Sequence, residues 1–235
     1  MHRPSSQLKF FYYSALLFSI PIIFGCSASK VAISSPSANI SYNVTSGGIS
    51  GNWGELGFQK GDRVPDFTLY DTDGKQFDLS SELKLRKPVV LITASYTCDV
   101  SRYNIPAIKS ISSKYKNEFN FFMVYLIEPH PADAPSPYSA DGKIWLATAN
   151  IRDHVEANQP KTYQQRVDIS KKWKQTYNIN LPVLIDNPKN IFWSDFGEAP
   201  NMAYVILPNR TVYYKQPWFN QPLLDQELQA LAGNH

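Results

Sequence analysis

One thiol and two imidazoles are the side chains of this 235-residue sequence best suited to act on a substrate. Cys98 follows an apolar run at Pro88–Ala94 and precedes a helical pattern that is clear from about Ile105. The start of a helix favours a thiolate over a thiol, because the helix dipole and the free N–H groups are positive there. His130 and His154 lie in the long segment after the next strand, and imidazole has the pKa that suits proton transfer near neutral pH. This pattern predicts a nucleophilic thiolate with a proton donor beside it.

A thiolate at Cys98 can attack a polarisable, electron-poor atom. Attack on iodine gives a sulfenyl iodide and a carbanion-like carbon that needs a proton, whereas attack on a peroxide oxygen gives a sulfenic acid. Glu128 precedes His130 by two residues and is a candidate to orient its imidazole. Arg152 or Arg166 is a candidate to hold a substrate carboxylate in a bidentate pair. The expected substrate is therefore a small molecule, either a halogenated aromatic compound or a peroxide.

Each of these residues also has a structural interpretation. A lone thiol behind an apolar strand is often a buried, inert side chain. His130 can be a hydrogen-bonding residue of a loop, His154 part of a solvated helix start, and Arg166 a member of an ion pair. Trp145 and Trp218 can line a pocket for an aryl group or pack in the core. The residues alone leave both interpretations open.

The composition excludes several classes of protein. The 23 basic residues nearly balance the 20 acidic ones, which argues against a nucleic-acid binder. The only cysteines are Cys26 and Cys98, so a disulfide-stapled scaffold and a cysteine-rich metal or cluster site are excluded. His130 and His154, with Glu128 or Asp133, lack the spacing of a metal-ligand set. We expect no metal and no tightly bound cofactor.

The amino terminus predicts export and a membrane anchor. Arg3 and Lys9 precede about 15 apolar residues, which is typical of a secretory signal, since a membrane span needs roughly 20. Residues 23–26, Ile-Phe-Gly-Cys, resemble the lipobox of bacterial lipoproteins, in which the cysteine carries the lipid and becomes the first mature residue. The alternative is an uncleaved anchor helix with an incidental cysteine. Both predict a membrane-anchored protein on the extracytoplasmic, periplasmic side.

The sequence predicts three regions along the chain. Residues 1–25 are the signal, with lipidation at Cys26, and the acyl groups include palmitate by resemblance. Residues 26–56 are rich in Ser, Asn and Gly and predict a flexible tether. Residues 57–235 form one α/β domain whose order of strands and helices is that of a thioredoxin-like fold, with an N-terminal hairpin and a long loop insertion. The expected strands lie at 67–70, 76–79, 88–94, 119–127, 183–185, 203–207 and 212–214, and the expected helices at 105–115, 162–177 and 222–232, with a proline-rich loop at 128–160.

Two sets of motifs carry a family resemblance. Gly61-Asp62-x-x-Pro65-Asp66-Phe67 resembles the opening of redoxin and peroxiredoxin-type domains. The stretch from Val89 to Trp218 resembles the iodothyronine deiodinases, whose reactive selenocysteine follows a Ser-x-Thr tripeptide as Cys98 does here. The resemblance implies reductive dehalogenation at this thiol. The site it implies has catalytic Cys98, His130, His154 and Glu128, and substrate-binding Ser95, Thr97, Arg152, Arg166 and Trp218.

The chain departs from the deiodinase pattern at three places. Cys98 replaces the selenocysteine, Tyr96 replaces an auxiliary cysteine, and Asp99-Val100 replaces a pair of prolines. The resemblance therefore implies the fold and the layout of the site rather than iodothyronines as the natural substrate. Because Cys26 is expected to carry lipid, Cys98 has no partner within the chain. An external thiol, a thioredoxin-like protein or a second copy of the chain in a homodimer must then reduce it again.

Two further hypotheses compete with the deiodinase-like one. A one-cysteine peroxidase is favoured by Ser95, which stands three residues before Cys98 as the Thr or Ser of peroxiredoxins does. The other hypothesis is a non-enzymatic lipoprotein that uses the fold only as a binding or assembly module, since a fold does not dictate a function.

Overall fold

A computed structural model describes residues 35–42 and 52–233, all of which belong to one unit of the chain, Ser34–His235. The predicted signal at residues 1–25 and the predicted lipid attachment at Cys26 lie outside the described residues. Within the described ranges, no helix has both the length and the apolar character needed to cross a membrane.

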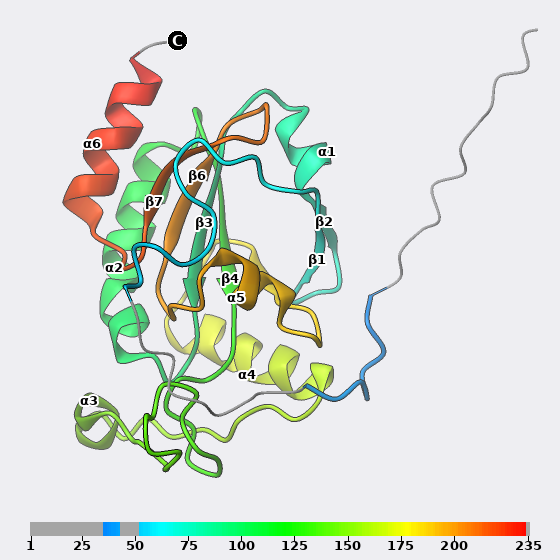
Figure 1. Cartoon of the computed structure of the whole chain (residues 1–235), viewed down its shortest axis with the longest axis vertical. Helices are drawn as coiled ribbons and strands as arrows, with labels where there is room; N and C mark the ends of the chain where they lie inside the picture. Colours follow the sequence, from blue (N-terminus) through cyan, green and yellow to red (C-terminus); the bar gives the residue numbers. More distant parts are fainter. Residues whose placement is uncertain (1–34, 43–51, 234–235) are drawn as a thin grey trace, which may run out of the picture. The chain divides into compact units, whose positions relative to one another are not determined.

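One mixed sheet organises the unit, with the strand order β2-β1-β5-β4-β3-β6-β7 (Figure 1). The central pairs β3–β4 and β4–β5 are parallel, and the outer pairs are antiparallel. The strands are β1 Thr68–Asp71, β2 Gln76–Asp78, β3 Val89–Ala94, β4 Asn120–Tyr125, β5 Val183–Ile185, β6 Ala203–Ile206 and β7 Val212–Gln216. The predicted mixed sheet with an N-terminal hairpin is confirmed.

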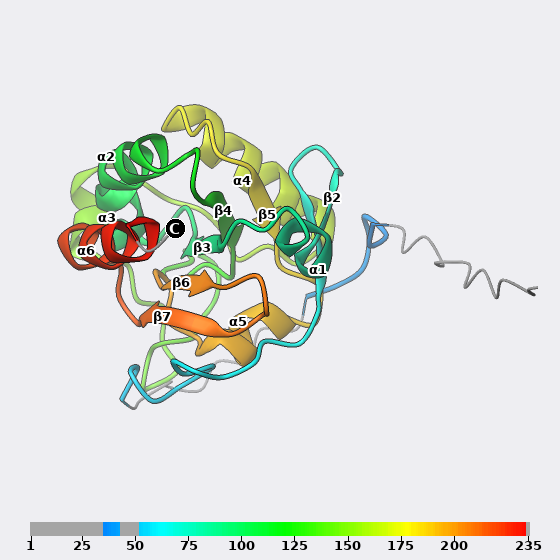
Figure 2. The same ribbon diagram turned by 90° about the horizontal axis from the view of Figure 1, so that it is seen from above.

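Helices cover both faces of the sheet. Figure 2 shows α2, α4 and α6 on one side and α5 on the other. The first three share one hydrophobic core with the sheet, while α1 and α5 share the second. The helices are α1 Leu79–Leu83, α2 Asp99–Lys114, α3 Thr148–Arg152, α4 Tyr163–Thr176, α5 Ile191–Phe196 and α6 Gln221–Ala232.

Strand β3 shows why Cys98 stands where it does. All six of its residues are buried, because alternate side chains enter the two cores: Val90 and Ile92 enter one, and Val89 and Leu91 the other. The strand ends at Ala94, so the four following residues carry the chain over the carboxyl edge of the sheet to the start of α2.

Helix α2 begins six residues before the predicted position. It starts at Asp99 rather than near Ile105, and Cys98 is its N-cap residue. The first turn shows no apolar periodicity because Asp99, Ser101 and Arg102 are polar. The Ser101 N–H donates to the Cys98 sulfur, and Arg102 donates to the Tyr96 carbonyl. The short helices α3 and α5 were also not predicted, since each is too brief to produce a periodic pattern.

The segment predicted as a flexible tether is held against the unit wherever it is described. We call residues 35–42 the strap. Its Ser41 pairs with Thr162 as an isolated bridge, and the Tyr42 hydroxyl donates to the Asp186 carbonyl oxygen at 2.6 Å. Further along, the Lys215 ammonium donates to backbone oxygens of residues 54 and 56. For these residues the structure corrects the prediction, because composition does not register single aromatic anchors such as Tyr42.

Candidate active site

The Cys98 thiol is buried at the start of α2. Its Sγ accepts the Ser101 backbone N–H at 3.3 Å, and the residue is 2% exposed. Burial raises the pKa of the thiol to about 11; the hydrogen bonds from Ser101 lower it, and the charges of Asp99 and Glu128 add to the rise. The helix-start position is as predicted, but the expected thiolate is not present at pH 7 in this conformation, because desolvation outweighs the N–H donor.

Glu128 binds the residue that precedes this thiol. Its Oε2 accepts the Thr97 backbone N–H at 2.7 Å and the Thr97 hydroxyl at 2.6 Å, and its Oε1 accepts the Tyr125 hydroxyl. The carboxylate is fully buried, and burial raises its pKa although these donors lower it. The predicted contact between Glu128 and the His130 imidazole is not formed; the carboxylate fixes the turn that carries Cys98 instead.

The His130 imidazole is held by a backbone carbonyl. Its Nδ1 lies 3.0 Å from the Trp145 oxygen, and because a carbonyl only accepts, Nδ1 must donate and Nε2 is left as the acceptor. The His130 and Trp145 rings lie edge to face, with 4.6 Å between their centres. Burial lowers the pKa of His130, so the ring is neutral at pH 7. The backbone N–H of His130 donates to the Thr97 hydroxyl at 3.2 Å, and this hydrogen bond joins the His130 segment to the turn that carries Cys98.

A buried arginine and an asparagine complete the support of that turn. Asn150 donates to the Thr97 carbonyl at 2.8 Å and accepts from Arg102 at 2.6 Å. Arg102 also donates to the Tyr96 carbonyl at 3.3 Å and pairs with Asp153 at 3.4 Å. Neither residue was predicted. The available signal was the position of Arg102, one turn into the helix that Cys98 caps.

The other predicted histidine and arginine of this region face solvent. Arg152 donates to Asp153 at 2.9 Å and to the Tyr103 hydroxyl. His154 is exposed at a φ of 52° and lines a cavity of about 300 Å³ beside α3. No hydrogen bond connects either side chain to Thr97, Cys98 or His130 within the described part of the chain.

The remaining predicted residues lie in three different surroundings. The Ser95 hydroxyl is buried and has no hydrogen-bond partner among the described residues. Arg166 is buried in α4, where it donates to Asn190 at 2.9 Å and lies 3.3 Å below the centre of the Tyr42 ring. Trp218 is 40% exposed. Arg166 therefore stands beneath the strap and not at an open surface where a substrate carboxylate could reach it.

Three aromatic side chains from distant segments gather in one cluster, and we call them the aromatic rim. Trp53 lies 5.8 Å from Tyr138 and 5.9 Å from Trp218 between ring centres. Trp193 donates to the Tyr138 hydroxyl at 3.1 Å and thereby fixes that ring. Burial raises the pKa of Tyr138, and the proximity of Cys98 raises it further. Only Trp218 of the rim was predicted, because the contacts join residues more than 80 positions apart.

The larger cavities lie away from the thiol. One of about 930 Å³ separates the strap from the start of α5 and is lined by Ile40, Asn190 and Trp193 among others. Within residues 35–42 and 52–233, no group of three His, Cys, Asp or Glu side chains has the arrangement of a metal site.

Residues 59–216 match the model of the redoxin family. The chain belongs to the redoxin family. Two solved structures are similar to this chain, each with a TM-score of 0.50 and 20% sequence identity. The first is a candidate protein disulfide isomerase from Bacteroides thetaiotaomicron, and the match covers 74% of this chain and 91% of that chain. The second is a candidate thiol:disulfide interchange protein DsbE from Chlorobium tepidum, and the match covers 73% of this chain and 96% of that chain. At this identity the likeness shows the fold, and the predicted thioredoxin-like fold is confirmed.

Proposed function

We propose that this redoxin-family protein is a thiol-dependent reductase in which Cys98 is the nucleophile, and that its reaction is reductive dehalogenation of an aryl halide. The observation that carries the proposal is the position of Sγ: it caps α2, accepts the Ser101 N–H and is close enough to Tyr138 of the aromatic rim to raise the pKa of that hydroxyl. An aromatic substrate can stack on such rings, and helix-start donors stabilise the sulfur anion that the attack requires.

His130 supplies the proton transfer in this proposal. In the neutral ring Nε2 accepts the thiol proton, while the Trp145 carbonyl holds Nδ1–H and stabilises the imidazolium that forms. The thiolate attacks iodine, the S–I bond forms and the C–I bond breaks, and the imidazolium protonates the departing carbon. An external thiol then displaces iodide to give a mixed disulfide, and a second thiol releases Cys98 and leaves as a disulfide. In total, one aryl iodide and two thiols give an arene, iodide, a proton and a disulfide.

This chemistry requires the site to open. Cys98 is 2% exposed, and no hydrogen bond joins its sulfur to His130 within the described residues. Tyr138 and Trp145 both belong to the segment between β4 and α3, residues 126–147, which we call the β4–α3 loop. Movement of this loop would expose the sulfur and bring Nε2 to it, which lowers the barrier that the raised thiol pKa imposes.

A one-cysteine peroxidase is the second candidate, and the buried Ser95 hydroxyl favours it. This hydroxyl has no partner among the described residues, so it is available to a small oxidant beside the thiol turn. The thiolate would break the O–O bond, become a sulfenic acid and release an alcohol or water. A rate constant with peroxide no greater than that of free cysteine would exclude this candidate.

Iodide release from an iodinated phenol, with dithiothreitol as the reductant, tests the main proposal. The full chain should release iodide, Cys98→Ser should release none above background, and Cys26→Ser should retain the rate per folded molecule. Release that is unchanged in Cys98→Ser would remove Cys98 from the reaction. In the cell we place this activity at the extracytoplasmic face of a membrane, with Cys26 as the lipid anchor and an external thiol or thioredoxin-like protein as the reductant.

A further inference from the structure

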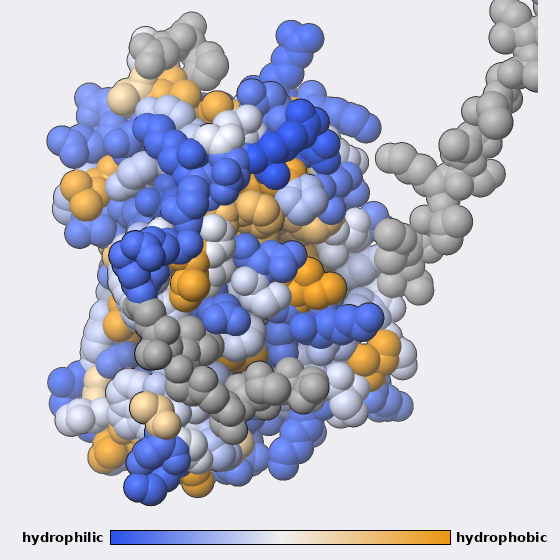
Figure 3. Space-filling view, in the orientation of Figure 1, coloured by the Kyte–Doolittle hydropathy of each residue, from blue (hydrophilic) through white to orange (hydrophobic). Residues whose placement is uncertain are grey.

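Four apolar side chains reach solvent beside the His130 end of the site, and we call them the apolar patch. Ile144 is 52%, Trp145 49%, Leu146 38% and Ile151 62% exposed. Leu146 and Ile151 line the same cavity, so the loop and α3 contribute to one continuous surface. Figure 3 shows small areas of hydrophobic surface, separated by hydrophilic ones, at the lower end of the unit where Figure 1 places α3. Exposed apolar side chains gathered in one region mark an interaction surface.

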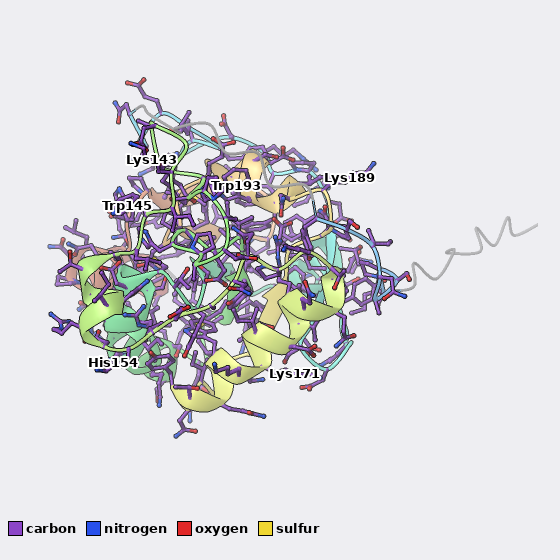
Figure 4. All side chains as sticks on the ribbon, turned by 90° about the horizontal axis from the view of Figure 1, so that it is seen from below. Lys143, Trp145, His154, Lys171, Lys189 and Trp193 are labelled. Carbon is purple, nitrogen blue, oxygen red and sulfur yellow. The ribbon has the colours of Figure 1, made fainter. Side chains whose placement is uncertain are left out.

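Basic side chains stand directly at both ends of this patch. Lys143 precedes Ile144 and its side chain is 78% exposed; Arg152 follows Ile151 and its side chain is 66% exposed. Each also contacts an exposed acidic neighbour, Asp141 at 2.7 Å and Asp153 at 2.9 Å. These contacts are weak in water, so the long basic side chains can reach past them to anionic headgroups. In Figure 4 Lys143 and Trp145 lie near each other on the loop, viewed from the end of the unit that also carries His154.

We propose that the apolar patch docks on a lipid surface, with Trp145 in the interface and Lys143 and Arg152 at the headgroups. Indole rings and flanking basic residues are the side chains that prefer this boundary. The predicted attachment point at Cys26 is nine residues before Ser35. Nine residues span at most about 30 Å, so an anchored chain keeps the strap, and the unit with it, close to the bilayer.

Docking would also affect the proposed reductase reaction, and this part of the inference rests on that proposed function. Trp145 holds His130 through its carbonyl oxygen and covers the ring edge to face. A lipid surface that takes up the Trp145 indole draws it away from His130 and loosens the β4–α3 loop over Cys98. The substrate is then an apolar molecule dissolved in the membrane, which enters the site from the lipid side.

Hydroxyl-radical footprinting of the full chain on vesicles of phosphatidylcholine with 30% phosphatidylglycerol tests the docking. Trp218 is a matched internal control because it is 40% exposed against 49% for Trp145. We expect Trp145 to be oxidised at least about fivefold more slowly than Trp218. Lys143→Gln with Arg152→Gln should lower the affinity for anionic vesicles by about fivefold for each lost charge, and should thereby reduce the protection of Trp145. Equal oxidation of the two tryptophans on vesicles would overturn the proposal, and would leave a protein partner as the occupant to seek.

Alkylation of Cys98 by N-ethylmaleimide, followed by mass spectrometry of its peptide, tests the coupling. On vesicles, Ile144→Ser with Ile151→Ser should slow alkylation several-fold, because the loss of two apolar side chains of the patch weakens docking and leaves the β4–α3 loop closed over Cys98. Leu85→Ser is the control because it removes an apolar side chain that is 63% exposed elsewhere. An unchanged rate in the double variant would overturn the coupling. Neither experiment requires the protein to turn over a substrate. If Trp145 is protected on vesicles but no iodide is released from the iodinated phenol, the proposed reductase activity is refuted and the docking proposal stands.

Discussion

Two buried carboxylates follow adjacent parallel strands of the sheet, and they are alike in their electrostatics. Glu128 comes three residues after β4, and Asp186 comes directly after β5. Both are fully buried, and burial raises the pKa of both, that of Asp186 to about 6. The charge of Arg166 lowers both values. From burial and charge alone, either residue would be an equal candidate for function.

Their hydrogen-bond partners distinguish them. Asp186 accepts three backbone N–H groups from its own sequence neighbourhood, those of Asn187, Phe192 and Trp193, at 2.7, 3.0 and 3.1 Å. Glu128 accepts both donors of Thr97, which is 31 residues away and adjacent to the thiol. A buried carboxylate whose partners are all local organises a helix start, whereas one that also binds a distant residue positions another segment. We therefore assign Asp186 to the fold and Glu128 to the site.

Removing either carboxylate should have the largest effect on stability. We expect Glu128→Ala and Asp186→Ala each to lower the free energy of unfolding by about 3 kcal/mol or more, because each leaves buried donors without an acceptor and Arg166 with one charge fewer to balance it. Urea unfolding measures this, and Glu156→Ala at an exposed position should change it by less than about 0.5 kcal/mol. A loss below 1 kcal/mol for either buried residue would contradict the hydrogen-bond assignment.

Conservative amide substitutions should then separate the two residues by function. In Glu128→Gln the amide group points a donor at Thr97 or Tyr125, which displaces the turn before Cys98. We expect the thiol-dependent rate, kcat/KM, to fall about 100-fold, or about 2.7 kcal/mol. Asp186→Asn disturbs only the start of α5, and its rate should stay within about threefold of the original. Similar losses in both variants would show that Asp186 also supports the site.

The fold could be predicted from the sequence because its signals are local. Strand β3 is a continuous apolar run, Asp73-Gly74 marks the first hairpin, and the helix over 162–177 has a capping residue at Thr162. The position of Cys98 follows from the first of these, since a helix must return the chain after a central parallel strand. The start of α2 was missed because its first turn faces the site.

The contacts of the site could not be predicted, because they join residues that no local pattern connects. Asn150 reaches Thr97 across 53 residues, and Trp53 meets Tyr138 and Trp218 from opposite ends of the domain. The direction of the Cys98 pKa shift was also wrong for this reason. A helix start is visible in the sequence, but the burial that opposes it depends on a loop whose path is set by tertiary packing.

The pH dependence of stability gives a smaller effect that also compares the two acids. Because the pKa of Asp186 is raised from 3.8 to about 6 in the folded protein, the folded state binds the proton more tightly. Stability from this group is fully present below pH 4 and is lost as the pH rises to about 6. In the unsubstituted chain, this group should lower the free energy of unfolding by on the order of 1–3 kcal/mol between pH 4 and pH 6, and Asp186→Asn should remove that decline. Urea unfolding at pH 4, 5, 6 and 7 measures it. A curve parallel to that of the unsubstituted chain would mean that Asp186 titrates normally.

The smallest expected effect separates the strap from the thiol. Tyr42→Phe removes the hydroxyl that donates to the Asp186 carbonyl at 2.6 Å but keeps the ring over Arg166. We expect the free energy of unfolding to fall by about 1 kcal/mol, the usual value of one hydrogen bond. The rate of Cys98 alkylation should not change, because the strap contacts the Asp186 region and, of the two buried carboxylates, Glu128 is the one that binds Thr97. Tyr103→Phe is the control, because it loses an exposed hydroxyl contact to Asp153. If Tyr42→Phe alters the alkylation rate and Tyr103→Phe does not, the charge of Arg166 links the two carboxylates. The division between fold and site would then be incorrect.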